Sequence, residues 1–292
     1  KQFERHQRSL NLLLFQEMLE YIAYIDRVLS QDSGSLLLAG RSGTGRRNIV
    51  ALLSHIMDIE IVTPKMTRKY DIKSFQVELK ELLLVAGKGK ACCLLLEDYQ
   101  IINPTMLEYV NSLLSGGEVP GLFSSEELDQ LLSEIKDDAS RDGHFGSLYL
   151  YFTRRVKKNL RIVLVMDPHN AKFALRCQSN PAIFAYCTIM WITTFRGKSM
   201  NDIPKMLLRN ILNRDDDKKL DEESSQIIDS IKSIHEMYSQ SNISCPKQYT
   251  AFIKTFMEIY NEKLKIGLEQ SSHLNAGLNK LAEASTSVAT LQ

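Results

Sequence analysis

The sequence carries almost no net charge. Its 36 lysine and arginine residues are balanced by 35 aspartate and glutamate residues, which leaves +1. A chain without a strong field of one sign does not attract nucleic acid or an acidic membrane surface over a distance. We therefore expect no nucleic-acid partner, and we expect the partners it has to be recognised by local surfaces.

Long hydrophobic runs are also absent. The apolar stretches are short, as at 82–85, 92–96 and 162–166, whereas a membrane-spanning helix needs about 18 or more apolar residues. The sequence therefore predicts no membrane span. Hydrophobic residues still make up 44% of the 292 residues and charged residues 24%, which is the balance of a folded chain with room for about two domains.

Cysteines are few and lack the spacing of metal ligands. Their number is odd, and one adjacent pair lies inside an apolar run, where cysteine acts as a small hydrophobic residue. This indicates reduced thiols and an intracellular protein. The chain also opens on Lys1 without a basic-then-apolar leader, so we expect no secretory signal and a piece of a longer protein. The cysteines are Cys92, Cys93, Cys177, Cys187 and Cys245.

Short apolar runs alternate with helical patterns over the first two thirds of the chain. Apolar residues recur three or four apart in the helical segments, whereas the strand candidates are brief continuous runs. Strands alternating with helices predict an α/β fold with a mostly parallel sheet that is covered on both faces. The predicted helices are 12–29, 46–57 and 72–86, and the predicted strands are 34–40, 59–62, 92–96, 162–166 and 188–192.

The last third of the sequence contains only helical patterns. Helices are predicted at 206–212 and 227–238, on either side of a charged run at 214–219, and a helix of more than forty residues starts at Pro246. Near its end the residues Leu274, Leu278, Leu281, Ser285 and Val288 repeat at heptad spacing, which predicts a coiled coil that needs a second helix. A single amphipathic helix packed on the domain is the alternative. The predicted boundaries are 1–195 for the α/β domain, 196–248 for a small helical lid and 249–292 for the long helix.

A glycine-rich turn joins the first strand to its helix. Its glycine spacing is that of a phosphate-binding loop, whose backbone N–H groups surround phosphates at a helix N-terminus. Arg46 stands where such a loop has lysine and keeps the positive charge. Arg47 replaces the Ser or Thr that ligates Mg²⁺ and has no acceptor atom, so Mg²⁺ is possible but weakened. The predicted nucleotide-binding residues are Gly40, Arg41, Ser42, Gly43, Thr44, Gly45, Arg46 and Arg47.

Other interpretations of this turn stay open. It is also compatible with an ordinary tight connection between a strand and a helix. Arg46 and Arg47 are compatible with surface cations that pair with nearby acids.

Two adjacent acids, Glu97 and Asp98, follow the third apolar run. In a nucleotide hydrolase this place holds an Asp that binds the metal's water shell and then a Glu that orients the attacking water. The order is reversed here, so Glu97 would bind the metal through water and the shorter Asp98 would position water poorly. We therefore expect slow or absent hydrolysis, while a solvated loop start is the plainer interpretation. Asp167 ends the fourth run, where it could sense a γ-phosphate but would also repel it.

A series of ordered motifs runs along nearly the whole chain. The most specific is Gly-Glu-Val-Pro-Gly-Leu-Phe at 117–123, and others lie at 25–29, 180–184, 245–249 and 273–278. Together they resemble the fourth AAA+ module of the dynein heavy chains, continuing into the first helix of the microtubule-binding stalk. Within that family, Gly-Arg-Arg at 45–47 and Leu-Leu-Glu-Asp-Tyr-Gln at 95–100 are most similar to the dynein 2 branch, the motors of retrograde intraflagellar transport.

This resemblance implies a place in a ring of six modules, with ATP or ADP bound between neighbours and ring movements passed to the stalk. It implies as partners the neighbouring AAA+ modules of the same heavy chain, a second stalk helix, the microtubule through the stalk, and other dynein subunits. It also implies a place in the cytoplasm, on the cytoskeleton and in the cilium.

Three more residues gain a role only through the resemblance. Lys247 matches a cation position near the nucleotide, and Asp167 replaces a sensor Asn. Tyr186 stands where an arginine finger would complete the preceding module's site, and a phenol cannot supply that charge. A packed aromatic residue is the alternative for Tyr186.

The function predicted from these features is regulatory. The module would bind ATP or ADP, hydrolyse it slowly or not at all, and couple the ring to the stalk. One rival is an active ATPase in which Arg46 replaces the lysine and the reversed acids still position water. A module with an empty pocket is the other.

Overall fold

The computed structural model describes residues 13–192, 195, 197–212, 219–239 and 245–291. They form two compact units, one up to Ser199 and one from Met200 onward. Within the described residues, no helix is both long enough and apolar enough to cross a membrane.

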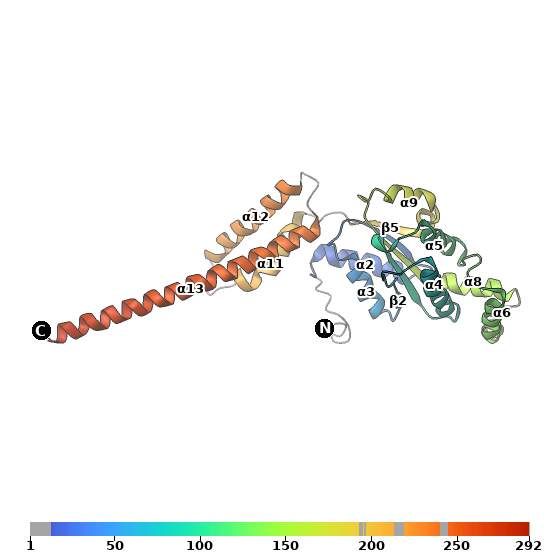
Figure 1. Ribbon diagram of the computed structural model, residues 1–292, viewed down its shortest axis with the longest axis horizontal. Helices are drawn as coiled ribbons and strands as arrows, with labels where there is room; N and C mark the ends of the chain where they lie inside the picture. The colour runs from blue at the N-terminus through green and yellow to red at the C-terminus, as the bar shows by residue number, and fades with distance from the viewer. Residues whose placement is uncertain (1–12, 193–194, 196, 213–218, 240–244, 292) are drawn as a thin grey trace. The chain divides into compact units, whose positions relative to one another are not determined.

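A five-stranded parallel sheet forms the centre of the first unit (Figure 1). Its strand order is β2-β3-β4-β1-β5, and β1 pairs with β4 and β5 on its two sides, with Leu37 opposite Leu164 and Ile189. All five residues of β1 are buried, as expected for a central strand covered on both faces. The predicted parallel sheet is thus confirmed, with strands β1 (Ser35–Ala39), β2 (Glu60–Val62), β3 (Cys92–Glu97), β4 (Leu160–Met166) and β5 (Cys187–Trp191).

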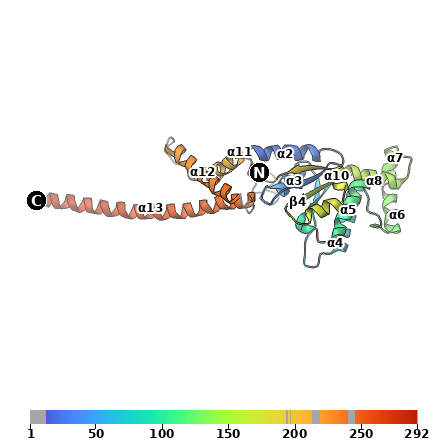
Figure 2. The ribbon, with the colours of Figure 1, turned by 90° about the horizontal axis from the view of Figure 1, so that it is seen from above.

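Two groups of helices cover the sheet (Figures 1 and 2). One group is α2 (Gln16–Leu29) and α3 (Arg46–Ile56), and the other includes α4 (Ile72–Gly87), α5 (Pro104–Gly116) and α8 (Leu148–Asn159). The N-cap residue Asp71 accepts a hydrogen bond from the Ser74 backbone N–H at 2.8 Å, which starts α4 and lowers the pKa of Asp71. The shorter helices are η1 (Asp98–Gln100), α6 (Ser125–Glu134), α7 (Lys136–Arg141), α9 (Phe173–Ser179) and α10 (Ala182–Tyr186).

A cluster of buried hydrophobic residues lies between the sheet and the second helix group. Phe75 and Leu79 of α4 are 0% and 1% exposed, and they pack with Leu94 of β3 and Val110 of α5. Burial of such side chains is the main favourable term in folding. It fixes the strands whose carboxyl ends carry the candidate site.

In the described residues, the second unit contains most of α11 (Gly197–Leu212) together with α12 (Lys219–Ser239) and α13 (Pro246–Leu291). Tyr249 of α13 is fully buried. Its hydroxyl donates to the Met200 carbonyl oxygen at 2.5 Å, and its ring lies 4.5 Å from that of His235 in α12. The described residues of this unit contain no strand, as predicted. The charged run at 214–219 lies outside the described residues, apart from Lys219.

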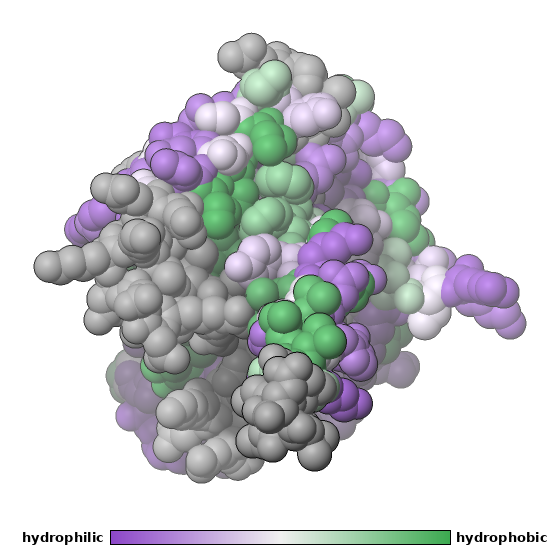
Figure 3. Space-filling view, turned by 90° about the vertical axis from the view of Figure 1, so that its left-hand side faces the viewer, coloured by the Kyte–Doolittle hydropathy of each residue, from purple (hydrophilic) through white to green (hydrophobic). Residues whose placement is uncertain are grey.

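The distal part of α13 is exposed. Three leucines of the predicted heptad seam, Leu274, Leu278 and Leu281, are 70%, 63% and 69% exposed. A view from the side where α13 ends shows apolar side chains among hydrophilic ones on the surface (Figure 3). The side chains of Ser285 and Val288 lie outside the described residues. These leucines leave an apolar stripe that a second helix could cover.

Gly40 holds the end of β1 close to the segment after β5. Its N–H donates to the Met166 carbonyl oxygen at 2.9 Å, and the Ile192 N–H donates to the Ala39 carbonyl oxygen at 2.7 Å. A Cβ on Gly40 would lie 1.9 Å from the Ile192 carbonyl oxygen. No side chain fits there unless the backbone moves.

Gly40→Ala should therefore lower the free energy of unfolding by about 3 kcal/mol, the cost of forcing atoms into a packed site. Urea denaturation measures this. Gly116→Ala is the matched control, because its Cβ would meet only the Glu118 side chain at 3.5 Å, and we expect a change within about 0.5 kcal/mol. Equal stabilities of the two variants would contradict the close approach.

Candidate functional site

The glycine-rich loop lies at the carboxyl ends of the parallel strands, between β1 and α3. Gly43 and Gly45 have φ angles of 96° and 76°, which glycine adopts without strain. Gly45 is the N-cap of α3, and the first turn has neither a side-chain cap nor an acidic residue. The N–H groups and partial positive charge of this turn therefore suit an anion.

Arg46 points into the protein instead of out of the loop. Only 8% of the residue is exposed. Its Nη1 donates to the carbonyl oxygens of Leu38 in β1 and Met166 in β4, each at 2.8 Å, and its Nη2 donates to the Arg41 carbonyl oxygen at 3.0 Å. Burial lowers the pKa of Arg46, and the charges of Asp167, Asp98 and Glu97 oppose that shift. Arg46 is thus a structural cation of the loop, and the surface-cation interpretation is wrong for it.

The other loop residues divide between the interior and the surface. Thr44 is fully buried, and its hydroxyl donates to the Arg41 carbonyl oxygen at 3.3 Å. Ser42 and Gly43 are exposed. The Arg41 carbonyl oxygen therefore faces inward toward Arg46 and Thr44, while the tip of the loop faces solvent.

Arg47 is the next residue of the same helical turn and pairs with an acid. Its Nη1 is 3.1 Å from Oε1 of Glu97, and the two side chains are 52% and 17% exposed. The Tyr99 hydroxyl lies 3.4 Å from the same Glu97 oxygen. The surface-cation interpretation therefore describes Arg47, and its partner is the acid predicted to hold the metal's water shell.

Asp98 is held by two groups. Its Oδ1 accepts from Nη1 of Arg176 at 2.6 Å, and its Oδ2 accepts from the Asp167 backbone N–H. Arg176, on α9, also donates to the Ile101 carbonyl oxygen at 3.2 Å. Sequence analysis missed Arg176, and no motif around it points to the role. Both oxygens of the acid that would orient water are thus already engaged.

Asp167 is connected to the loop through His169. Its Oδ1 accepts from the backbone N–H of His169 at 2.9 Å, and the His169 ring nitrogen Nδ1 is 3.2 Å from the same oxygen. Nε of Arg41 lies 3.3 Å from that ring nitrogen. The sequence suggested no role for His169, yet it links the loop to Asp167.

Tyr186 does not join this cluster. Tyr186 ends α10 just before β5 starts, so it lies at the opposite end of the sheet from the loop. It is 49% exposed, with Nζ of Lys157 at 5.0 Å from the ring centre, so it is not a packed core aromatic. Lys247 is an exposed residue in the first turn of α13, in the second unit.

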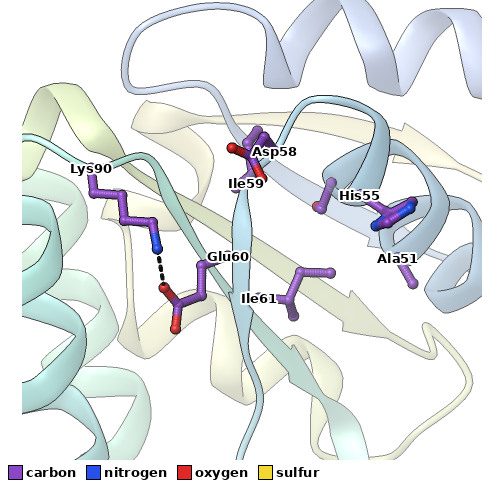
Figure 4. Close-up of a pocket in the computed structure, with 8 residues that line it drawn as sticks. Ala51, His55, Asp58, Ile59, Glu60, Ile61 and Lys90 are labelled. Atoms are coloured by element: carbon purple, nitrogen blue, oxygen red, sulfur yellow. Dashed lines mark hydrogen bonds and ion pairs between the residues drawn. The ribbon is translucent and has the colours of Figure 1, made fainter. Parts of the chain in front are cut away.

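A separate cavity of about 570 Å³ lies at the opposite end of α3 (Figure 4). It is lined by Ser54 and His55 from α3 and by Glu60 and Lys90, which pair at 3.0 Å. Ser54 Oγ is buried and has no hydrogen-bond partner. The cavity shares no residue with the loop, so it is not the phosphate site.

The loop suits a polyphosphate, but the residues around it do not suit Mg²⁺. The helix turn offers N–H donors without a competing side-chain cap. At the metal position, a guanidinium already faces the Glu97 carboxylate, whereas Mg²⁺ needs oxygen ligands in an octahedron at about 2.1 Å. Among the described residues, no group of three or more His, Cys, Asp or Glu side chains could hold a metal ion.

The two neighbouring arginines should differ sharply in their effect on stability. Arg46→Met would remove the three hydrogen bonds from the guanidinium to the carbonyl oxygens of Leu38, Met166 and Arg41, so we expect a loss of about 3 kcal/mol or more in urea denaturation. Arg47→Met removes only a half-exposed ion pair and should cost about 1 kcal/mol at most. Similar losses for both variants would contradict the inward position of Arg46.

Comparison with known proteins identifies the family. A family model described as the P-loop containing dynein motor region D4 matches residues 10–259. Cytoplasmic dynein 2 heavy chain 1 of Rattus norvegicus is 44% identical over 290 residues, or 97% of this chain. The Chlamydomonas reinhardtii protein of the same name is 42% identical over 296 residues and covers 100% of it. Dynein axonemal heavy chain 8 of Homo sapiens is 33% identical over 302 residues, or 97% of it.

The chain spans about 7% of the length of each of these relatives. The AAA+ fold class and the resemblance predicted from the sequence are both confirmed. The chain therefore belongs to the dynein heavy chain family and corresponds to region D4 of its motor.

Proposed function

We propose that this module binds ATP or ADP at the loop between β1 and α3, turns it over slowly or not at all, and couples a ring of modules to a stalk. The observation that carries the proposal is the site's pairing pattern. The anion-binding turn has no side-chain cap and no acidic residue, whereas Glu97 and Asp98 are each paired with an arginine.

Binding is supported by the shape of the loop. The inward Arg46 fixes the Arg41 carbonyl oxygen relative to β1 and β4, so the loop keeps its curvature without a ligand. A preformed loop loses little conformational entropy when phosphate binds. The rival with an empty pocket has less support, because the turn lacks an acid that would repel phosphate.

Slow turnover is supported by the state of Asp98. A general base must turn an oxygen toward the attacking water, within hydrogen-bond reach of it. Both Asp98 oxygens accept hydrogen bonds from protein groups. The rival ATPase would have to use a carboxylate that is held in place by Arg176, whose side chain is only 12% exposed.

Coupling is supported by the family and by α13. In this proposal the neighbouring AAA+ modules flank the nucleotide. Tyr186 supplies no charge to the preceding module's site, and Lys247 is kept as the cation that the family resemblance predicts near a nucleotide. The exposed leucines of α13 would pack against a second stalk helix that leads to the microtubule. The similarity to dynein 2 heavy chains supports this proposal. In it, the parent motor works with other dynein subunits on the cytoskeleton, in the cytoplasm and the cilium, and drives retrograde intraflagellar transport.

Asp98→Asn in the parent motor tests turnover at this module. We expect the motor ATPase rate and the velocity of microtubule gliding to stay within about twofold of wild type, because the carboxylate is not used as a base. Arg176→Gln is the matched control, since it breaks the same ion pair and leaves the carboxylate in place. A fall of tenfold or more with Asp98→Asn alone would establish the rival ATPase.

Leu278→Asp tests the stalk. A charge on the seam would separate the two helices, so microtubule stimulation of the motor ATPase should fall about fivefold or more. Asn279→Asp adds the same charge one residue away, off the seam, and should have little effect. If both variants retain full stimulation, the exposed leucines are not part of a coiled coil.

A further inference from the structure

We propose that the ligand of this loop is the free nucleotide rather than its magnesium complex, and that the Arg47 guanidinium takes the place of the divalent cation. This inference rests on the proposed function, because it requires that the module bind a nucleotide. The inference concerns whether Mg²⁺ or a guanidinium balances the negative charge of the phosphates.

The position of Arg47 carries the first step. It is the second residue of α3, where an intact phosphate loop has the hydroxyl that ligates Mg²⁺. Arginine has five N–H donors and no acceptor, and it stays protonated in proteins. A cation therefore lies permanently where a metal ligand would be, and it would repel a second cation.

The Glu97 carboxylate carries the second step. It faces the guanidinium at 3.1 Å, closer than a carboxylate that reaches a metal through a water molecule. The backbone N–H of Glu97 donates to Gln100 Oε1 at 2.8 Å, and the amide nitrogen of Gln100 donates to the Pro64 carbonyl oxygen at 2.9 Å. Gln100 is only 1% exposed. The end of β3 is thus fixed, and Glu97 remains directed at Arg47.

Charge balance carries the third step. An intact loop combines one lysine and one Mg²⁺ with two acids, which leaves one positive charge for the phosphates. In this chain the site has four arginines and three acids, which also leaves one positive charge. They are Arg41, Arg46, Arg47 and Arg176 with Glu97, Asp98 and Asp167. The arginines alone supply the charge that the metal would bring.

The exposure of Arg47 carries the last step. Its side chain is 52% exposed and the ion pair engages Nη1, so donors remain for phosphate oxygens. A guanidinium binds phosphate in a bidentate fork. Arg46 cannot do the same from its present position, because both of its terminal nitrogens donate to backbone carbonyl oxygens.

Nucleotide retention by the parent motor tests this inference. The motor is loaded with ATP in the presence of Mg²⁺ and desalted into buffer with either Mg²⁺ or EDTA. The nucleotide is then released by acid, and ATP plus ADP per motor is counted by ion-exchange chromatography.

Gly43→Asp places a carboxylate in the loop at an exposed position with a φ of 96°, where Asp and Asn are the best tolerated side chains after glycine. Gly43→Asn has the same shape without the charge.

The wild-type count minus the Gly43→Asp count gives the nucleotide held by this module. We expect a difference of about one per motor in both buffers, with Gly43→Asn retaining about as much as wild type. A difference of one in Mg²⁺ that vanishes in EDTA would overturn the metal-free site and leave the proposed function intact. No difference in either buffer would overturn the proposed function, and the inference with it.

Arg47→Thr tests the residue itself. The variant restores the hydroxyl that ligates Mg²⁺ and removes the guanidinium, so the nucleotide of this module should become sensitive to EDTA. We expect its half-life on the motor to fall at least tenfold in EDTA and to stay near the wild-type value in Mg²⁺. If retention by Arg47→Thr in EDTA equals that of wild type, Arg47 does not replace the metal.

Discussion

The hydrogen bonds of one buried guanidinium underlie the whole site. Arg46 joins β1, β4 and the loop through the carbonyl oxygens of Leu38, Met166 and Arg41. Such charge-assisted bonds are strong, and leaving their partners unpaired in the interior is costly. The loop is therefore fixed from within, whereas a lysine at this position would extend along the loop toward the phosphates. Because Arg46 is used to hold the loop in place, other groups must balance the negative charge of a bound phosphate.

The remaining charges of the site are arranged as a consequence. Asp98 pairs with Arg176, Glu97 pairs with Arg47, and Asp167 lies against His169. Hydrolysis needs a carboxylate that is free to take a proton and a metal that polarises the phosphate. Paired carboxylates offer neither, but they do not weaken an anion-binding turn. A site can thus lose the groups that break a phosphate bond and keep the groups that hold it.

Much of this could be predicted from sequence, because periodicity and glycine spacing are local signals. The short apolar runs predicted the parallel sheet, and the glycine spacing at 40–47 predicted the loop at the carboxyl ends of its strands. Arg176 and His169 could not be predicted, since they reach Asp98 and Arg41 only after folding brings distant segments together. The inward turn of Arg46 also had no signal, because a side-chain direction depends on carbonyl oxygens from two strands. Helices α5–α8 were missed, although Asn103 and the pair Ser124 and Glu127 form ordinary N-caps.

A nucleotide that stays bound would stabilise the module constantly, whereas one that is hydrolysed would not. A ligand at a hundred times its dissociation constant stabilises the state that binds it by about 2.7 kcal/mol, and this contribution is constant as long as the ligand is not hydrolysed. Helix α13 lies in the second unit, and the apolar stripe of its distal part is exposed. The helix can transmit a movement only if its first turns are held rigidly. If the ligand needs no metal, the stabilisation that it provides is also independent of Mg²⁺. A metal-free site whose carboxylates are paired with arginines would then keep this module in one conformation. The conformational changes of the motor would have to originate in its other modules.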